Sequence, residues 1–215
     1  WLDFAALLGF LLSDEDPLVH ASLGEEFWRL RYLDESWLQA NVERIFPTAP
    51  DKQILFDAAW SMFVSRSGYL PDENWLALLR PFFHHALRFR AKALKDQPTD
   101  EKQANGSTDD RILARTLGTL YLYGLLDLAA GDLLDLYFAH AGDDDARSVV
   151  DLLCHNLESE PSRHSDAAQN VEVGSTEQLA TWVQRARELW NWRRASILPS
   201  IERHSNEAAA FVHLF

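Results

Sequence analysis

The stretch DENWLALLRPFFHHALRFRAKALK, Asp72–Lys95, decides the fold class. Its large apolar residues recur every three or four positions, the spacing that places side chains on one face of an α-helix. These residues are Trp75, Leu76, Leu79, Phe82, Phe83, Ala86 and Leu87. Such a broad apolar stripe predicts a long helix packed against a core. Pro81 removes one backbone donor, so we expect it to kink the helix or split it into two.

Three more helices are expected before this stretch, each opened by an aspartate. Aspartate favours helix starts because its carboxylate accepts hydrogen bonds from unpaired backbone N–H groups. The first predicted helix covers Asp16–Tyr32, with proline at its first helical position and Leu18 on its apolar face. The second begins at Asp34. The third begins at Asp51, and its apolar stripe includes Ile54.

After the stretch, a helix from Asp110 to about Leu125 is apolar on nearly every side, which is typical of a central helix. Gly118 and Gly124 are expected to let neighbouring backbones approach it closely. Further helices are predicted at Gly131–Ala141, at Asp144–Glu158, at Thr176–Ile197 and after Pro199. No alternating Val/Ile/Thr run typical of a strand occurs. The sequence therefore predicts an all-α fold.

Length and charge narrow the function classes. The 215 residues carry 33 acidic and 20 basic side chains, a net charge of −13. Such a balance disfavours nucleic acid and anionic membrane surfaces as partners. The single cysteine, Cys154, forms no internal disulfide and fits a cytoplasmic protein. Because the chain begins at Trp1 within an apolar stretch that is too short to cross a bilayer, we expect one domain, residues 1–215, cut from a longer protein.

A weak internal repeat suggests how the helices are arranged. The segments 37–57 and 132–151 each contain an apolar helix, a short turn and a second helix opened by an aspartate. They lie 94 residues apart, enough for two helix pairs of about 45 residues, the length of HEAT-like units. Stacked antiparallel helix pairs in an irregular HEAT-like α-solenoid are therefore expected. A compact multi-helix bundle is the alternative.

The run Leu120–Ser159, LYLYGLLDLAAGDLLDLYFAHAGDDDARSVVDLLCHNLES, with Gly68–Leu87 before it, carries a family resemblance. Its succession of two apolar helices and an acidic turn resembles the C-terminal helical-repeat regions of large bacterial antiphage proteins, especially STAND-type NTPases. In those proteins the array senses a phage protein or couples sensing to assembly. The resemblance implies a sensing or scaffolding role, and it assigns no individual functional residue.

Two polar stretches, 96–109 and 159–175, interrupt the helical pattern. Apart from two valines they lack large apolar residues, so they cannot offset the entropy lost on ordering. We interpret them as surface insertions. The alternative is that one of them orders on a partner.

Sequence motifs do not indicate a catalytic, cofactor or metal site. Gly-rich phosphate loops and nucleophile elbows are missing from the sequence. The run Asp143–Asp145 is consecutive rather than spaced by a helical turn, which is typical of a helix start rather than of a magnesium site. The histidines lack di-iron and zinc spacings, and Cys154 lies among apolar residues. We expect no enzyme activity, no cofactor and no bound metal.

The stretch Thr181–Ser196, TWVQRARELWNWRRAS, is interpreted as the only cationic island. Its predicted buried stripe contains Leu179, Trp182, Val183, Ala186, Leu189, Trp190 and Ile197. The candidate protein-contact residues lie off that stripe and are Arg185, Trp192, Arg193 and Arg194. Exposed tryptophan beside arginine is typical of a protein–protein hot spot. An ordinary solvated helix face and a nucleic-acid contact are the alternatives.

These observations predict a non-catalytic helical-repeat module that contacts a protein partner or other domains of its own chain. The alternative is an all-α domain with a ligand pocket lined by aromatic side chains. Those side chains are Trp60, Trp75, Phe82, Phe83 and the tyrosines of Tyr121–Tyr123.

Overall fold

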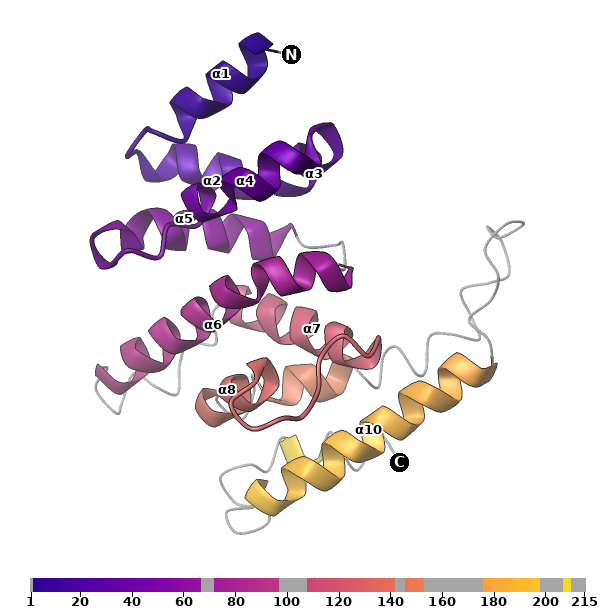
Figure 1. Ribbon diagram of the computed structural model, residues 1–215. Helices are drawn as coiled ribbons and strands as arrows, with labels where there is room; N and C mark the ends of the chain where they lie inside the picture. The colour runs from indigo at the N-terminus through magenta and orange to yellow at the C-terminus, as the bar shows by residue number, and fades with distance from the viewer. Residues whose placement is uncertain are drawn as a thin grey trace. The chain divides into compact units, whose positions relative to one another are not determined.

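The computed structural model describes residues 2–66, 72–96, 108–141, 146–152, 176–197 and 207–209 (Figure 1). Within these ranges all regular secondary structure is helical, which confirms the predicted all-α fold. None of the helices in them is both long and apolar enough to cross a membrane. The chain divides into two compact units, Trp1–Ala93 and Leu94–Phe215, and each is described by itself. A single domain over the whole chain stays a prediction.

The first unit begins with four helices, of which the second and third replace the one helix predicted over Asp16–Tyr32. They are α1 (Leu2–Leu11), α2 (Pro17–Glu25), α3 (Phe27–Leu33) and α4 (Glu35–Ile45). The helix predicted over Asp16–Tyr32 is interrupted at Glu26, where φ is −89° and ψ is 6°. Two of the three predicted aspartate caps are confirmed, because Asp16 accepts from the Leu18 N–H and Asp34 from the Trp37 N–H, each at 2.9 Å. The third is wrong, since the helix there begins at Gln53 and Asp51 lies in the 3-10 turn before it.

The first unit continues with a 3-10 turn (Pro50–Lys52), α5 (Gln53–Ser65) and α6 (Glu73–Asp96). Of the two outcomes predicted at Pro81, the split is wrong, since α6 is one helix on both sides of it, and the kink stays a prediction. Pro81 lies at an exposed position, so its missing N–H falls on the solvent side of the helix, where it is tolerated.

The buried stripe of α5 differs from the predicted one by about one residue. The predicted stripe includes Ile54, but Ile54 is 70% exposed, whereas Phe56 and Trp60 are buried. Burying two large aromatic rings removes more apolar surface from water than burying Ile54 and the small residues near it, so the helix turns that face inward. Leu18, predicted to lie on an apolar face, is likewise 75% exposed.

The first unit contains two helix pairs, α2 with α4 and α5 with α6, and corresponding helices of the two pairs are in contact. The C-terminal ends of α2 and α5 meet, because Glu25 accepts from Arg66 Nε at 3.0 Å and the two helices pack along their length. The N-terminal ends of α4 and α6 meet where Trp75 contacts Glu35. Thus α2 and α5 run in the same direction, and α4 and α6 meet at their N-terminal ends. The repetition of this pattern into a solenoid stays a prediction.

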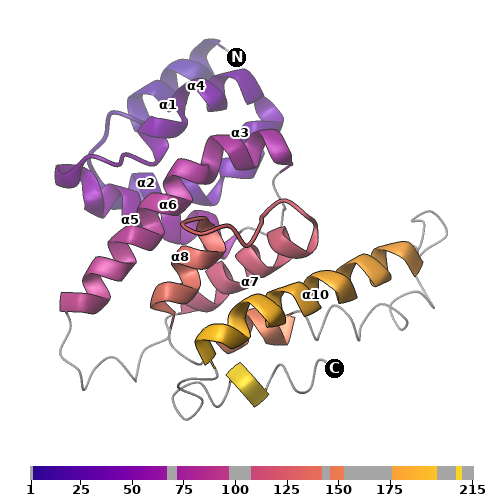
Figure 2. The same ribbon diagram turned by 60° about the horizontal axis from the view of Figure 1, so that its bottom comes forward.

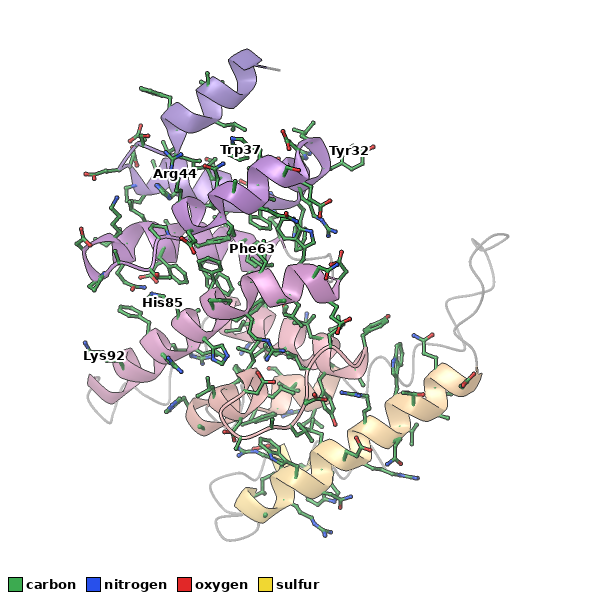
Figure 3. All side chains as sticks on the ribbon, in the orientation of Figure 1. Tyr32, Trp37, Arg44, Phe63, His85 and Lys92 are labelled. Atoms are coloured by element: carbon green, nitrogen blue, oxygen red, sulfur yellow. The ribbon has the colours of Figure 1, made fainter. Side chains whose placement is uncertain are left out.

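Aromatic rings fill the core between these pairs. Phe27 is the centre, with its ring centroid 5.4 Å from Phe46, 5.1 Å from Phe63 and 5.7 Å from Trp75. Two of these contacts are edge-to-face, the geometry that aromatic quadrupoles favour. Phe63 is labelled at this core in Figure 3.

The second unit contains α7 (Thr108–Leu122), α8 (Leu133–His140), a helical stretch at 146–152, α10 (Thr176–Ile197) and a helical turn at 207–209. Figure 2 shows α10 beside α7, with which it packs. The bounds of α10 are those predicted from the sequence. Gly118 is approached closely by side chains rather than by the expected backbone, since an added Cβ would lie 3.1–3.2 Å from the side chains of Leu152 and Val149. Gly124 instead ends α7 with a positive φ of 78°.

Several predicted features fall on residues that the structure does not describe. Of the two polar stretches, 97–107 and 159–175 lie outside the described residues, while Asp96 ends α6 and Thr108 begins α7. The run Asp143–Asp145, Cys154 and the helix predicted directly after Pro199 lie outside them too.

Candidate protein-contact surfaces

The predicted contact residues lie on α10, and its buried stripe determines what each can do. The side chains buried along this helix are Trp182, Ala186, Leu189, Arg193 and Ile197. Four of these five were predicted to be buried, and Arg193 was not. The other members of the predicted stripe, Leu179, Val183 and Trp190, are half-buried.

Arg193 is an internal side chain, contrary to its predicted place on an exposed face. It is 6% exposed, and its Nε and Nη2 donate to the two carboxylate oxygens of Glu207 at 2.7 and 3.1 Å. Its guanidinium carbon lies 4.8 Å from the centroid of the Phe138 ring. Burial is tolerable because the charge is paired by two parallel hydrogen bonds. Arg193 therefore holds the 207–209 turn against α10.

Arg185 also binds within its own unit. Its Nη2 donates to the Leu126 carbonyl oxygen at 2.7 Å, and its guanidinium lies 4.5 Å from the centroid of the Tyr121 ring. The Tyr121 hydroxyl in turn donates to the Arg185 carbonyl oxygen at 2.8 Å. Burial raises the pKa of this hydroxyl well above its usual value, with the Arg185 charge opposing the rise. Arg185 thus fixes the end of α7 on α10.

Trp192 and Arg194 keep surface that a partner could reach. Trp192 is half-buried, with its ring centroid 5.8 Å from that of Phe138, and Arg194 is exposed. The predicted contact face of α10 is therefore reduced to the outer edge of Trp192 and the Arg194 side chain.

Sequence reasoning missed a closer repeat in the first unit. YLDESWL, residues 32–38, returns as YLPDENWL, residues 69–76. Asp34 and Asp72 occupy equivalent positions and cap their helices alike, since Asp72 accepts from the Trp75 N–H at 3.0 Å. Their separation of 38 residues in the sequence is the spacing between the second helices of the two pairs. We name the two DExWL segments, 34–38 and 72–76, the paired motifs.

The paired motifs contact one another. The buried indole of Trp75 donates from Nε1 to Glu35 Oε1 at 2.6 Å. Arg31 donates from Nη2 to Asp72 Oδ2 at 2.6 Å, and its guanidinium lies 4.9 Å from the centroid of the Trp75 ring. The Trp75 N–H and the Arg31 guanidinium hold the pKa of Asp72 below its usual value. A charged and an aromatic contact thus join the two helix pairs.

Large apolar side chains remain exposed on the helices of the first unit. They are Leu7, Phe10, Leu18, Tyr32, Leu33, Ile54 and Phe89. Tyr32 and Leu33 are neighbours at the end of α3 and are 92% and 53% exposed, and Figure 3 shows the Tyr32 side chain directed away from the helices. Phe10 and Leu7 lie one turn apart on α1 and are 70% and 52% exposed.

A polar chain links α5 to α6 at the surface of the first unit. Asp57 Oδ1 accepts from Gln53 Nε2 at 2.8 Å, which turns the Gln53 oxygen towards His85 Nε2, 2.9 Å away. His85 Nε2 is therefore the donor to that oxygen. Its ring lies 4.5 Å from Phe56 and is stacked with Phe89 at 6.5 Å and 10° between planes. Burial lowers the pKa of His85, and the Asp57 charge opposes this effect.

His20, one of the histidines considered as a metal ligand, lies near backbone carbonyl oxygens. His20 is buried with its ring nitrogens 3.3 and 3.1 Å from the carbonyl oxygens of Ile45 and Asp14. Within the described ranges, no group of three or more His, Cys, Asp and Glu side chains is placed to hold a metal ion.

No protein family matches this chain, and neither does any curated protein or solved structure. The resemblance of Leu120–Ser159 to antiphage helical-repeat regions therefore stays a prediction.

Proposed function

We propose that this chain is a non-catalytic helical-repeat module that binds protein. The observation that carries the proposal is the exposed pair Tyr32 and Leu33 at the end of α3. Isolated apolar residues are common on protein surfaces, but here two large ones are exposed at the same end of one ordered helix. Tyrosine supplies a large contact area at a small entropic loss, which makes it frequent in protein interfaces.

The stacking of the first unit supports the same function. Because α2 lies on α5 and the paired motifs join α4 to α6, the helices form a rigid support for the side chains on their outer faces. Rigid support favours binding because less conformational entropy is lost on association. As a wider role, we propose a sensing or scaffolding part of a larger cytoplasmic bacterial protein, of the antiviral-defence kind that Leu120–Ser159 resembles.

Site-specific photo-crosslinking in the native host tests the proposal. A photoreactive amino acid replaces Tyr32, and in a matched control it replaces Glu43, an exposed residue on α4. The module binds protein through this patch if Tyr32 yields a discrete adduct of higher mass and Glu43 does not. Equal adduct patterns at both positions, or no adduct at Tyr32, would contradict it.

A further inference from the structure

The part of α6 from Arg80 to Ala93, where the first unit ends, carries a charge opposite to that of the rest of the unit. Residues 80–93 contain four basic and no acidic side chains, whereas residues 1–72 contain twelve acidic and five basic ones. The sequence interpretation of Thr181–Ser196 as the only cationic island therefore omitted a second one. The basic residues of this second cluster lie within RPFFHHALRFRAKALK, residues 80–95. They are separated by apolar residues, so the sequence reads mainly as an apolar helix.

The exposed side of this helix combines charge with an apolar surface. Arg88 and Lys92 are exposed and lie four residues apart, so they occupy neighbouring turns of one face, separated by about 6 Å along the axis. Phe89 between them is 40% exposed. The opposite face, which includes Phe83 and Leu87, is buried in the core. Figure 3 labels Lys92 and His85 along the same helix.

His85 adds a flat apolar surface and no positive charge at neutral pH. Its pKa is lowered by burial, and its Nε2–H is held by Gln53, whose amide nitrogen is in turn held by Asp57. The ring is stacked with Phe89. The neutral His85 ring thus packs against the Phe89 ring. Arg88 and Lys92 supply the cationic groups of this face.

We propose that this face of α6, formed by Arg88, Phe89 and Lys92 with His85 beside Phe89, binds an acidic protein segment that also carries an apolar side chain. Carboxylates one helical turn apart, or two residues apart in an extended segment, match the spacing of Arg88 and Lys92. Phe89 then contacts the apolar side chain. This is a second surface, separate in sequence from the Tyr32 patch, and it rests on the proposed function insofar as the ligand is a protein.

Charge favours a short acidic protein segment over nucleic acid. At physiological ionic strength a charge is screened over about 8 Å, so a short segment responds only to the local cationic face. A nucleic acid carries one charge per about 1.7 Å along its axis and extends over the acidic surroundings as well, where it is repelled. The excess of acidic residues within residues 1–72 opposes that longer ligand.

Fluorescence anisotropy with a short labelled peptide of repeated Glu-Leu-Glu-Asp units tests the inference on the full chain. We expect the double variant Arg88→Glu/Lys92→Glu to lose at least about tenfold in affinity. Phe89→Ala should weaken binding several-fold, but not for a peptide with serine in place of leucine. The matched control is Arg187→Glu/Arg194→Glu, which reverses two exposed charges on α10.

Three outcomes overturn the inference: unchanged binding by the α6 double variant, an equal loss in the α10 control, or tighter binding of single-stranded oligothymidylate through the same α6 residues. Circular dichroism melting of each variant shows that the fold is retained. Failure of this test leaves the Tyr32 adduct intact, and failure of the crosslinking test leaves peptide binding intact, so the two proposals are distinguishable.

Discussion

Gly24 of α2 lies so close to Ala59 of α5 that a Cβ added to the glycine would be 2.0 Å from the Ala59 carbonyl oxygen. The two backbones are therefore in direct contact, without side chains between them. This contact fixes the distance between the first helices of the two stacked pairs. Any larger residue at position 24 must push α2 away from α5, because the obstructing atoms belong to a backbone rather than to a flexible side chain.

We predict that Gly24→Ala destabilises the protein by about 3 kcal/mol or more, since overpacking a rigid contact displaces whole helices. The measurement is the free energy of unfolding in urea. Gly9→Ala is the matched control, because Gly9 also lies within a helix but an added Cβ would meet nothing within 4 Å. Alanine there should stabilise α1 by up to about 1 kcal/mol. Equal effects at the two positions would contradict the close contact.

Arg193→Ala should destabilise the second unit by about 3–5 kcal/mol, because it leaves the Glu207 carboxylate buried without its cation. Thermal and urea unfolding measure the loss. The double variant Arg193→Met/Glu207→Leu should recover much of it, since no charge remains buried. The exposed neighbour in Arg194→Ala should change stability by less than about 0.5 kcal/mol. An Arg193 variant as mild as the Arg194 variant would show that the ion pair is not buried in solution.

His85 makes stability depend on pH in a known direction. Burial lowers its pKa in the folded state below the ordinary value of 6.5, so the unfolded chain binds the proton more tightly. Its contribution is therefore complete above about pH 6.5 and is lost as pH falls towards the lower folded pKa. We predict that wild type loses more melting temperature between about pH 7.5 and 5 than His85→Gln does. The same acid sensitivity in both proteins would contradict this role of His85.

Local sequence signals predicted the helices better than the contacts between them. The Asp34 cap and both bounds of α10 follow from residues within one helical turn, so they could be predicted. The burial of Arg193 could not, although it lies four residues after Leu189 on the buried stripe, because its partner Glu207 is fourteen residues away and no spacing indicates that pairing.

The other incorrect or incomplete predictions also have specific structural causes. Ile54 is exposed because α5 turns to bury larger rings, and only the neighbouring helices determine that choice. The repeat of YLDESWL as YLPDENWL was hidden by the inserted Pro71, which shifts the register by one residue. Of the contact residues predicted on α10, Arg185 and Arg193 instead contact aromatic rings of their own unit. The sequence could not distinguish this role from contact with a partner, because an arginine near aromatic residues can serve in either.

The first unit contains two equivalent helix pairs that are joined through the paired motifs. A double-mutant cycle between Glu35→Ala and Trp75→Phe measures this junction, because alanine removes the carboxylate and phenylalanine keeps an aromatic ring without the indole N–H. Glu73→Ala and Trp37→Phe, the same substitutions at the other copies of these two positions, form the control cycle. We predict a coupling of about 1 kcal/mol for Glu35 with Trp75 and additive effects in the control. Additive effects of Glu35→Ala and Trp75→Phe would show that the two pairs are not joined there.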